Sequence, residues 1–324
     1  MGQQPRLLRV GIGDDAAVWK TRRSHLSLVS TDALVDEVHF RLGATSAGAL
    51  GHKALAVNFS DIAAMGGSPT LAVVALGVTD RVDETWVRTF YHGMGTLAKR
   101  YGCAIAGGDI VRAPALFIAV TVIGEVRKSN LRLRCTAKAG DFACVTGALG
   151  LSAAALKAGV AADLQVRSAR IDPVDAALLR AAYETPTPRV PEGKFLGASR
   201  STHAMMDISD GLSLDAWRMA SASKLDVCLD VDALRRHCPK ALASLDNSLE
   251  LMLYGGDDYE LLAAVDPRAY QHIARRFKAR FGRELWVAGH FEQGDGKVWT
   301  LEDGNRREHA PRGYDHLNRA DDLA

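Results

Sequence analysis

Acidic residues beside glycine or serine are the residues of this chain best suited to chemistry. Six acid-rich turns are predicted: Gly13-Asp14-Asp15, Ser30-Thr31-Asp32, Asn58-Phe59-Ser60-Asp61, Gly107-Gly108-Asp109, Asp207-Ile208-Ser209-Asp210-Gly211 and Gly255-Gly256-Asp257-Asp258. Grouped carboxylates repel one another unless a cation lies between them, and Mg²⁺ prefers compact oxygen ligands together with phosphate oxygens. One such turn is more often a helix cap or a simple turn. Six of them across both halves predict a Mg²⁺ site for metal-assisted phosphoryl transfer.

The common nucleotide-binding patterns are absent or lie in the wrong context. Two strings match G-x-G-x-x-G/A, one from Gly11 to Ala16 and one from Gly93 to Ala98. The first leads into a predicted hairpin and carries two carboxylates where a pyrophosphate needs backbone amides, and the second lies inside a predicted helix. No G-x-x-x-x-G-K-[ST] string occurs. The sequence therefore argues against a Rossmann site and against a Walker A loop.

Length and composition indicate an ordinary globular protein. The chain has 324 residues, 48% of them hydrophobic, and a net charge of +2, which favours neither nucleic acid nor an anionic membrane as a partner. Its five cysteines form no C-x-x-C string, which is typical of reduced intracellular thiols. The apolar window from Ile62 to Val78 is interrupted by Gly66-Gly67-Ser68-Pro69. We therefore expect no signal peptide, no membrane span and a cytoplasmic location.

Alternating strands and helices must position the acidic turns, and a polar stretch from Val126 to Gly140 divides them. We place the boundary at Ala137, giving domains 1–137 and 138–324. The predicted elements of the first domain are strands Leu7–Val10, Ala16–Trp19, Leu26–Thr31, Leu71–Val78, Cys103–Ala106 and Ala115–Ile123, with helices from Ser46 to Met65 and from Asp83 to Gly102. Those of the second are strands Phe142–Thr146, Val227–Val231 and Val298–Leu301, helices Leu151–Ala158 and Ser213–Ser223, and an extended proline-rich loop, Glu184–Glu192.

Seven strings occur here in the order found in one enzyme family: GIGDDAAVW, STDALVDEVHF, KALAVNFSDIAAMGGSP, GGDIVR, VTGALGLSAAAL, MMDISDGLSLD and GGDDYELL. From about Gly11 to His316 the chain resembles the thiamine-monophosphate kinases, part of the ATP-binding superfamily of aminoimidazole ribonucleotide synthetase. The resemblance implies a mixed α/β, two-domain fold of that type. A sheet-plus-helices N-terminal domain and an α/β C-terminal domain would share one cleft. It also implies a homodimer joined through the N-terminal sheets.

The same resemblance implies an activity and a set of site residues. ATP would phosphorylate thiamine monophosphate to thiamine diphosphate, the final step of thiamine diphosphate biosynthesis. Transfer would be direct and in-line, with several Mg²⁺ ions, with ATP as co-substrate and with no residue as general acid or base. By motif position, the metal ligands are Asp15, Ser30, Thr31, Asp32, Asp61, Asp109, Asp207 and Asp210. ATP would contact Gly108, Asp109, Arg134 and Ser209, and the thiamine phosphate would contact His39, Asp257 and Tyr314.

The residues agree with these roles but allow alternatives. Arg134 can bind a phosphate with two parallel hydrogen bonds, and Tyr314 can stack on an aromatic ring, whereas His39 could also be an ordinary core or surface histidine. Asp257 stands where the family usually has Glu, and Ile110 follows the G-G-D string where Thr is common. One rival function is a sister enzyme that activates a ribonucleotide amide or selenide. Another is a non-catalytic protein that binds a nucleotide or thiamine phosphate. The retained acidic residues argue against the second rival.

Overall fold

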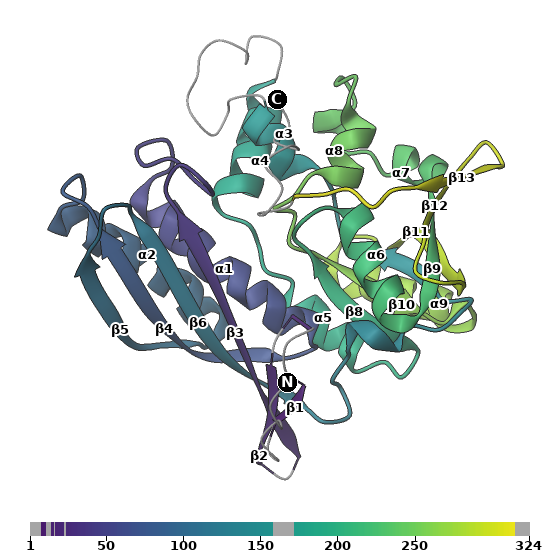
Figure 1. Cartoon of the computed structure of the whole chain (residues 1–324), viewed down its shortest axis with the longest axis horizontal. Helices are drawn as coiled ribbons and strands as arrows, with labels where there is room; N and C mark the ends of the chain where they lie inside the picture. Colours follow the sequence, from purple (N-terminus) through teal and green to yellow (C-terminus); the bar gives the residue numbers. More distant parts are fainter. Residues whose placement is uncertain (1–7, 11–13, 16, 23, 158–171, 315–324) are drawn as a thin grey trace.

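Two β-sheets and their helices form the frame of the computed structural model, which describes residues 8–10, 14–15, 17–22, 24–157 and 172–314 (Figure 1). The first sheet has the order β1-β2-β3-β6-β4-β5 and the second the order β13-β12-β9-β11-β7-β10-β8. The strands of the first are β1 (Leu8–Val10), β2 (Ala17–Arg22), β3 (His25–Val35), β4 (Ser68–Val78), β5 (Ala104–Arg112) and β6 (Phe117–Arg127). Three predicted element ends, Leu7, Ala16 and Ala158, lie outside the described residues.

Helices α1 (Ala47–Ala64) and α2 (Glu84–Tyr101) lie on one side of the first sheet (Figure 1). The α2 helix connects β4 to β5, which are the parallel pair of this sheet, while the other neighbouring strands are antiparallel. Residues of β6 alternate, so that Ile118, Val120 and Val122 are buried against the helices. Alternate residues between them lie on the opposite side, which we call the open face. The first sheet is therefore covered by these helices on one side only.

Both helices begin and end where the sequence predicts. The Ser46 hydroxyl accepts a hydrogen bond from the Ala49 amide at 3.2 Å and caps α1. The Asp83 carboxylate accepts one from the Trp86 amide at 2.7 Å and caps α2, which ends at Gly102 in the left-handed conformation. Most of α1 is buried on all sides because it also contacts α5, β8 and β10 of the C-terminal half. This central helix therefore joins the two halves.

The C-terminal half packs helices around a mixed seven-stranded sheet. Its strands are β7 (Phe142–Val145), β8 (Thr202–Ile208), β9 (Leu225–Asp230), β10 (Glu260–Val265), β11 (Trp286–Gln293), β12 (Val298–Glu302) and β13 (Asn305–His309). Its α-helices are α3 (Leu151–Lys157), α4 (Pro173–Glu184), α5 (Val190–Gly197), α6 (Leu212–Ser223), α7 (Val231–Arg236), α8 (Ser248–Tyr254) and α9 (Pro267–Phe281). The fold is the expected mixed α/β fold with two sheets. The boundary at Ala137 stays a prediction, and it lies in the stretch that joins them.

The structure corrects two predicted element boundaries. The proline-rich segment was expected to be extended to Glu192, but α5 begins at Val190, because Pro191 falls in the first helical turn, where its missing amide hydrogen is not needed. The strand expected at Cys103–Ala106 continues to Arg112, so Gly107-Gly108-Asp109 lies within β5 rather than in a turn after it. Among the described helices, none has the length and apolarity needed to cross a membrane.

Candidate active site

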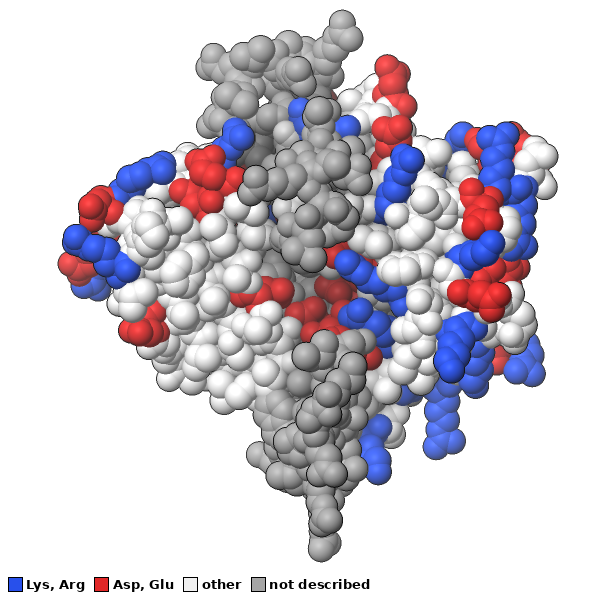
Figure 2. Space-filling model, viewed as in Figure 1, with Lys and Arg blue, Asp and Glu red and all other residues white. Residues whose placement is uncertain are grey.

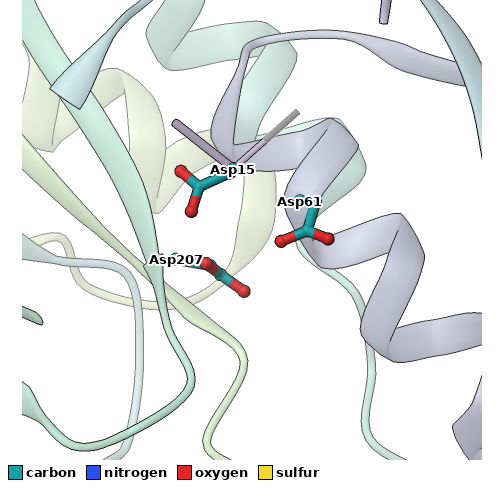
Figure 3. Close-up of side chains that lie close together, drawn as sticks. All are labelled: Asp15, Asp61 and Asp207. Carbon is teal, nitrogen blue, oxygen red and sulfur yellow. The ribbon is translucent and has the colours of Figure 1, made fainter. Parts of the chain in front are cut away.

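Three carboxylates from separate parts of the chain meet between the two halves. Asp15 precedes β2, Asp61 lies on α1 and Asp207 lies on β8. One carboxylate oxygen from each lies within 4.8 Å of the others, and the side chains point toward one another (Figure 3). Acidic side chains gather in the hollow between the halves (Figure 2). Since 192 positions separate Asp15 from Asp207 (207 − 15), this cluster exists only in the folded chain.

Hydrogen bonds from α1 and β3 hold the cluster in place. The Ser60 hydroxyl donates to Oδ2 of Asp207 at 2.7 Å, and the Ser30 hydroxyl donates to the carboxylate of Asp61. The Asn58 side-chain oxygen accepts the backbone amide of Asp32 at 3.2 Å. The predicted Ser-Thr-Asp and Asn-Phe-Ser-Asp turns are in fact inside β3 and α1, so regular secondary structure positions them.

The cluster carries more buried negative charge than its surroundings neutralise. Burial raises the pKa of Asp15 and Asp61 well above the usual value, and the charge of a neighbouring carboxylate raises it further. Burial also raises the pKa of Asp207, and it raises that of Asp32 to about 6. Among the described residues, Oδ2 of Asp15 is buried without a hydrogen-bond partner. Compact carboxylates with an unpartnered oxygen fit Mg²⁺, which binds hard oxygen ligands.

Arg134 lies at the edge of this cluster. Its guanidinium pairs with Asp15, and its Nε lies 3.3 Å from Oδ1 of Asp14. Its side chain is mostly buried, as expected for a group that faces the cleft rather than bulk water. A planar guanidinium can bind a phosphate with two hydrogen bonds. Its position is therefore suited to an anionic ligand that also reaches the carboxylates.

A second loop, from Ser209 to Gly211, follows β8 and is held by residues that sequence reasoning missed. Oδ2 of Asp215 accepts the backbone amides of Ser209 and Asp210, each at 3.0 Å. Arg218 donates to Oδ2 of Asp210 at 2.5 Å and to Oδ1 of Asp215 at 2.7 Å. Burial, with the nearby charge of Asp210, raises the pKa of Asp215 to about 7. The spacing of these residues along α6 was the available signal, since i and i+3 share one helix face.

Two of the three predicted substrate residues lie close together, and the third lies beside the Ser209–Gly211 loop. Asp257 and His39 are linked through two other residues: Lys53 pairs with Asp257 and lies over the Tyr183 ring, and the Tyr183 hydroxyl donates to the His39 carbonyl at 3.0 Å. The backbone amide of Tyr314 donates to the Asp210 carbonyl at 3.0 Å. Lys53, which the sequence analysis did not select, lies 2.7 Å from Oδ2 of Asp257. Burial disfavours the charged form of Asp257, but Lys53 and the Tyr259 hydroxyl together outweigh it and lower the pKa of this carboxyl.

Thr31, Gly108 and Asp109 do not join the cluster of their own chain through their side chains. The Thr31 hydroxyl is on the open face, where it donates to the Val120 carbonyl at 3.1 Å and accepts from Thr121 at 3.0 Å. Asp109 is exposed on the edge strand β5. Three strand spacings of about 4.8 Å each, roughly 14 Å in total, separate β5 from β3, which carries Asp32. Within one chain, the side chains of these residues therefore do not contribute to the acidic cluster.

The two halves match family models of AIR synthase related proteins. The N-terminal domain model matches residues 13–126 and the C-terminal domain model matches residues 138–301. Fold and site thus define a two-domain protein of the AIR synthase-related class.

Relatives narrow this class. The thiamine-monophosphate kinase of Bacillus subtilis (strain 168) is 36% identical over 274 residues, which are 83% of this chain and 82% of that protein. The solved structure of AaThiL complexed with AMPPCP and TMP is 30% identical, with a TM-score of 0.79 over 94% of this chain and 91% of that one. The thiamine-monophosphate kinase of Stenotrophomonas maltophilia K279a is 34% identical, with a TM-score of 0.78 over 93% and 92%. This chain belongs to the thiamine-monophosphate kinase family.

Proposed function

We propose that the protein uses ATP to phosphorylate thiamine monophosphate to thiamine diphosphate, by direct in-line transfer in the cleft between its two halves. A phosphate oxygen of thiamine monophosphate attacks the γ-phosphorus of ATP, and the bond between that phosphorus and the β-γ bridging oxygen breaks, so that ADP leaves. The observation that carries this proposal is the group of Asp15, Asp61 and Asp207, whose oxygens lie within 4.8 Å of one another. AaThiL, a relative of 30% identity, was solved with the ATP analogue AMPPCP and with TMP.

The carboxylates are proposed to hold several Mg²⁺ ions. Asp15, Asp61 and Asp207 form the centre, and the Ser30 hydroxyl, Asp32 and Asp210 stand beside it. For Thr31, whose hydroxyl lies on the open face, only a backbone contact is left within its own chain. When bound, Mg²⁺ neutralises phosphate charge and orients the phosphates for in-line displacement.

Other residues of the cleft would bind and orient the two phosphate substrates. Arg134 is proposed to bind the polyphosphate of ATP with its guanidinium, which here pairs with Asp14 and Asp15. Ser209 lies in the loop fixed by Asp215 and is proposed to contact the same nucleotide. No side chain is needed as a general acid or base, because the attacking phosphate oxygen is already ionised at neutral pH.

His39, Asp257 and Tyr314 are proposed to face thiamine monophosphate. The Asp257 carboxylate remains 32% exposed although Lys53 and Tyr259 contact it, so it can still accept a hydrogen bond from a ligand. The Tyr314 ring is partly exposed beside Asp210, where it could stack on a ring of the substrate. The Asp side chain at 257 is one methylene shorter than the usual Glu, so we expect the substrate to lie closer to β10.

The open face of the first sheet is the proposed homodimer contact. Strands β4 and β5 expose apolar side chains, with Val73 at 39% and Val111 at 43%, which an isolated sheet would leave in water. Pairing of two open faces would cover them. It would also explain why Gly108 and Asp109 lie away from Asp32 of their own chain, because we propose that they act in the cleft of the partner.

Mixed dimers test this arrangement. Asp61→Asn and Asp109→Asn are each expected to be inactive as purified homodimers. If Asp109 acts in the partner's cleft, a mixed dimer has one intact site, so random mixing should restore about a quarter of wild-type activity. If Asp109 acts within its own chain, mixing restores no activity.

The five cysteines are free, and a cytoplasmic location remains a prediction.

ADP release measured with ATP, Mg²⁺ and thiamine monophosphate tests the proposed function. Thiamine and formylglycinamidine ribonucleotide serve as parallel acceptors, and Asp61→Asn is the inactive control. Turnover with thiamine monophosphate alone, lost in Asp61→Asn, is the expected result. Turnover with the ribonucleotide instead would assign the chain to a sister activity. ATP binding without turnover on any acceptor would make it a binding protein.

A further inference from the structure

The buried ammonium group of Lys53 contacts the Asp257 carboxylate, which is proposed to bind the substrate. The Lys53 side chain is only 2% exposed, and its Nζ lies 2.7 Å from Oδ2 of Asp257 and 3.7 Å from the centroid of the Tyr183 ring. The Tyr259 hydroxyl donates to the other oxygen, Oδ1 of Asp257, at 2.7 Å. A buried lysine is costly unless it is paired and hydrogen-bonded, and here the pairing is complete. Lys53 therefore fixes the carboxylate from behind.

The backbone at Asp257 and Tyr259, the two residues joined by the Tyr259 hydroxyl, adopts an unusual conformation. Asp257 has φ of 66° and Tyr259 has φ of 51°, a left-handed conformation that non-glycine residues rarely adopt. Their amides are held by the carbonyls of Ser209 and Ile208 at 2.7 and 2.8 Å. Such strain persists only where the surrounding structure requires it, and it is common at ligand-binding positions. The Asp257 loop and the Ser209 loop are thereby tied into one unit.

Lys53 also sets a distance along α1. Ser60, which bonds Asp207 in the acidic cluster, lies seven residues after Lys53 (60 − 53) and thus on nearly the same face of the helix. Seven residues correspond to about 10 Å along the helix axis. One rigid element therefore supports both the acidic cluster and the Asp257 carboxylate. The supports on α1 are about 10 Å apart, a spacing compatible with an acceptor that has a phosphate at one end and a flat ring at the other.

Tyr183 connects the same lysine to the backbone of His39. Its ring lies under the ammonium, and its hydroxyl donates to the His39 carbonyl at 3.0 Å. Because the ammonium pairs with Asp257, it offsets the attraction of this carboxylate for a ring cation. The carboxylate can still accept a directional hydrogen bond.

We propose that Lys53 is a positioning residue for the acceptor substrate, which holds Asp257 as a fixed hydrogen-bond acceptor for a ring amino group. This inference rests on the proposed function. It assigns substrate selection to hydrogen bonding at the amino group of the pyrimidine ring rather than to attraction of the thiazolium charge. A substrate analogue in which a carbonyl oxygen replaces that amino group would place two acceptors against each other and be rejected.

The test compares Lys53→Met, Asp257→Asn and the double variant with the wild type, using thiamine monophosphate and oxythiamine monophosphate, the carbonyl analogue. Lys53→Met is expected to raise the KM for thiamine monophosphate about tenfold or more and to leave the KM for ATP within about twofold. It should also reduce the preference for thiamine monophosphate over the analogue. The exposed lysine of α2, Lys99, gives the control variant Lys99→Met, which should match the wild type on every measure.

The double variant separates positioning from a merely structural role. It contains no unpaired buried charge, so its melting temperature should recover relative to Lys53→Met, while its KM for thiamine monophosphate stays high. Recovery of that KM together with stability would overturn the inference, as would equal changes in KM for both substrates. Absence of wild-type turnover with thiamine monophosphate would instead overturn the proposed function.

Discussion

The Ser60 hydroxyl donates a 2.7 Å hydrogen bond to Oδ2 of Asp207, and this bond joins α1 of the first half to β8 of the second. Both side chains are buried. Asp61, the next residue of α1, supplies a carboxylate to the same cluster, so one helical turn carries both a ligand and the support of another ligand. The geometry of the cluster therefore depends on how the two halves are held together, as well as on its acidic residues.

Ser60→Ala should weaken metal binding more than it weakens folding. The variant removes a hydrogen bond to a buried charged acceptor, worth roughly 1.5–3 kcal/mol, and lets Asp207 move relative to Asp61. We expect the Mg²⁺ concentration for half-maximal activity to rise about fivefold to tenfold, measured by titrating Mg²⁺ at saturating ATP. Ser129→Ala is the control, because the Ser129 side chain is exposed and the side chain of its sequence neighbour Asn130 accepts its hydroxyl at 3.0 Å, far along the sequence from the acidic cluster. An unchanged Mg²⁺ requirement in Ser60→Ala would contradict the role given to this bond.

The stability gained from Mg²⁺ should increase with pH. Asp32 and Asp215 have folded pKa values raised to about 6 and about 7, from an ordinary value of 3.8. A carboxyl group with a raised folded pKa binds its proton more strongly when folded, so stability falls as pH rises from about 4 through about 7. Mg²⁺ would compensate this charge at Asp32 and its neighbours in the acidic cluster, while the contribution of Asp215, which pairs with Arg218, is present with and without metal. The difference in melting temperature between Mg²⁺ and EDTA samples should therefore grow from pH 5 to pH 8.

Comparing samples at equal pH removes contributions from other groups. Burial lowers the pKa of His52, which acts in the opposite direction near its ordinary value of 6.5, and this effect is present with and without metal. Asp61→Asn provides the second control, since it removes one carboxylate from the cluster and should flatten the dependence on pH. A metal-dependent difference that stays constant across this range would show that these carboxyl groups do not govern metal binding.

The sequence predicts local features of this fold well because they depend on near neighbours. Ser46 and Asp83 are cap residues at the predicted positions, and Gly102 ends α2. The α9 helix was missed although its signals were present, namely Asp266 as cap, Pro267 in the first turn and Gly282 after the end. These cap signals lie within a few residues of the helix, so the sequence alone is sufficient to predict it.

The composition of the site was less predictable, because its partners are far apart in the sequence. Lys53 and Asp257 are separated by 204 positions, and no local pattern couples them. Motif position predicts the same role, metal ligand, for the neighbours Ser30 and Thr31. Alternation along the strand separates them, because Ser30 faces the cluster and Thr31 faces the open face. Motif positions predict which residues serve a function, but only the paired strands show which face each residue occupies. The roles of Thr31 and Asp109 thus remain predictions.

The string Gly93-Met94-Gly95 resembles a nucleotide-binding pattern but lies inside α2, where Gly93 serves helix packing. A Cβ atom at Gly93 would lie 1.9 Å from the Gly48 carbonyl oxygen of α1, whereas a Cβ at Gly95 meets nothing within 4 Å. Gly93→Ala should therefore force α1 and α2 apart, lower the urea midpoint of unfolding and reduce activity, since α1 carries Asp61. Gly95→Ala is the matched control in the same helix and should stabilise the protein by about 0.5–1 kcal/mol. Equal effects of both substitutions would contradict this packing role.

Arg189 holds a buried carboxylate at the start of β10, close behind the Asp257 loop. Its guanidinium donates to both oxygens of Glu260, at 2.8 and 2.5 Å, and Glu260 is only 3% exposed. Arg189→Met leaves this buried charge with the Thr146 hydroxyl at 2.7 Å and with the guanidinium of Arg283 at 3.8 Å, which should cost about 3 kcal/mol in the free energy of unfolding. Replacing both partners, with Arg189→Met and Glu260→Leu, removes the charge and should recover much of the loss in the free energy of unfolding.

The control is Arg88→Met. Arg88 forms an ion pair with Glu84, both side chains are 76% exposed, and such a surface pair is worth less than about 1 kcal/mol. Urea unfolding measures all three. If Arg189→Met lowers the free energy of unfolding no more than Arg88→Met does, water reaches Glu260 and the buried ion pair does not stabilise the loop.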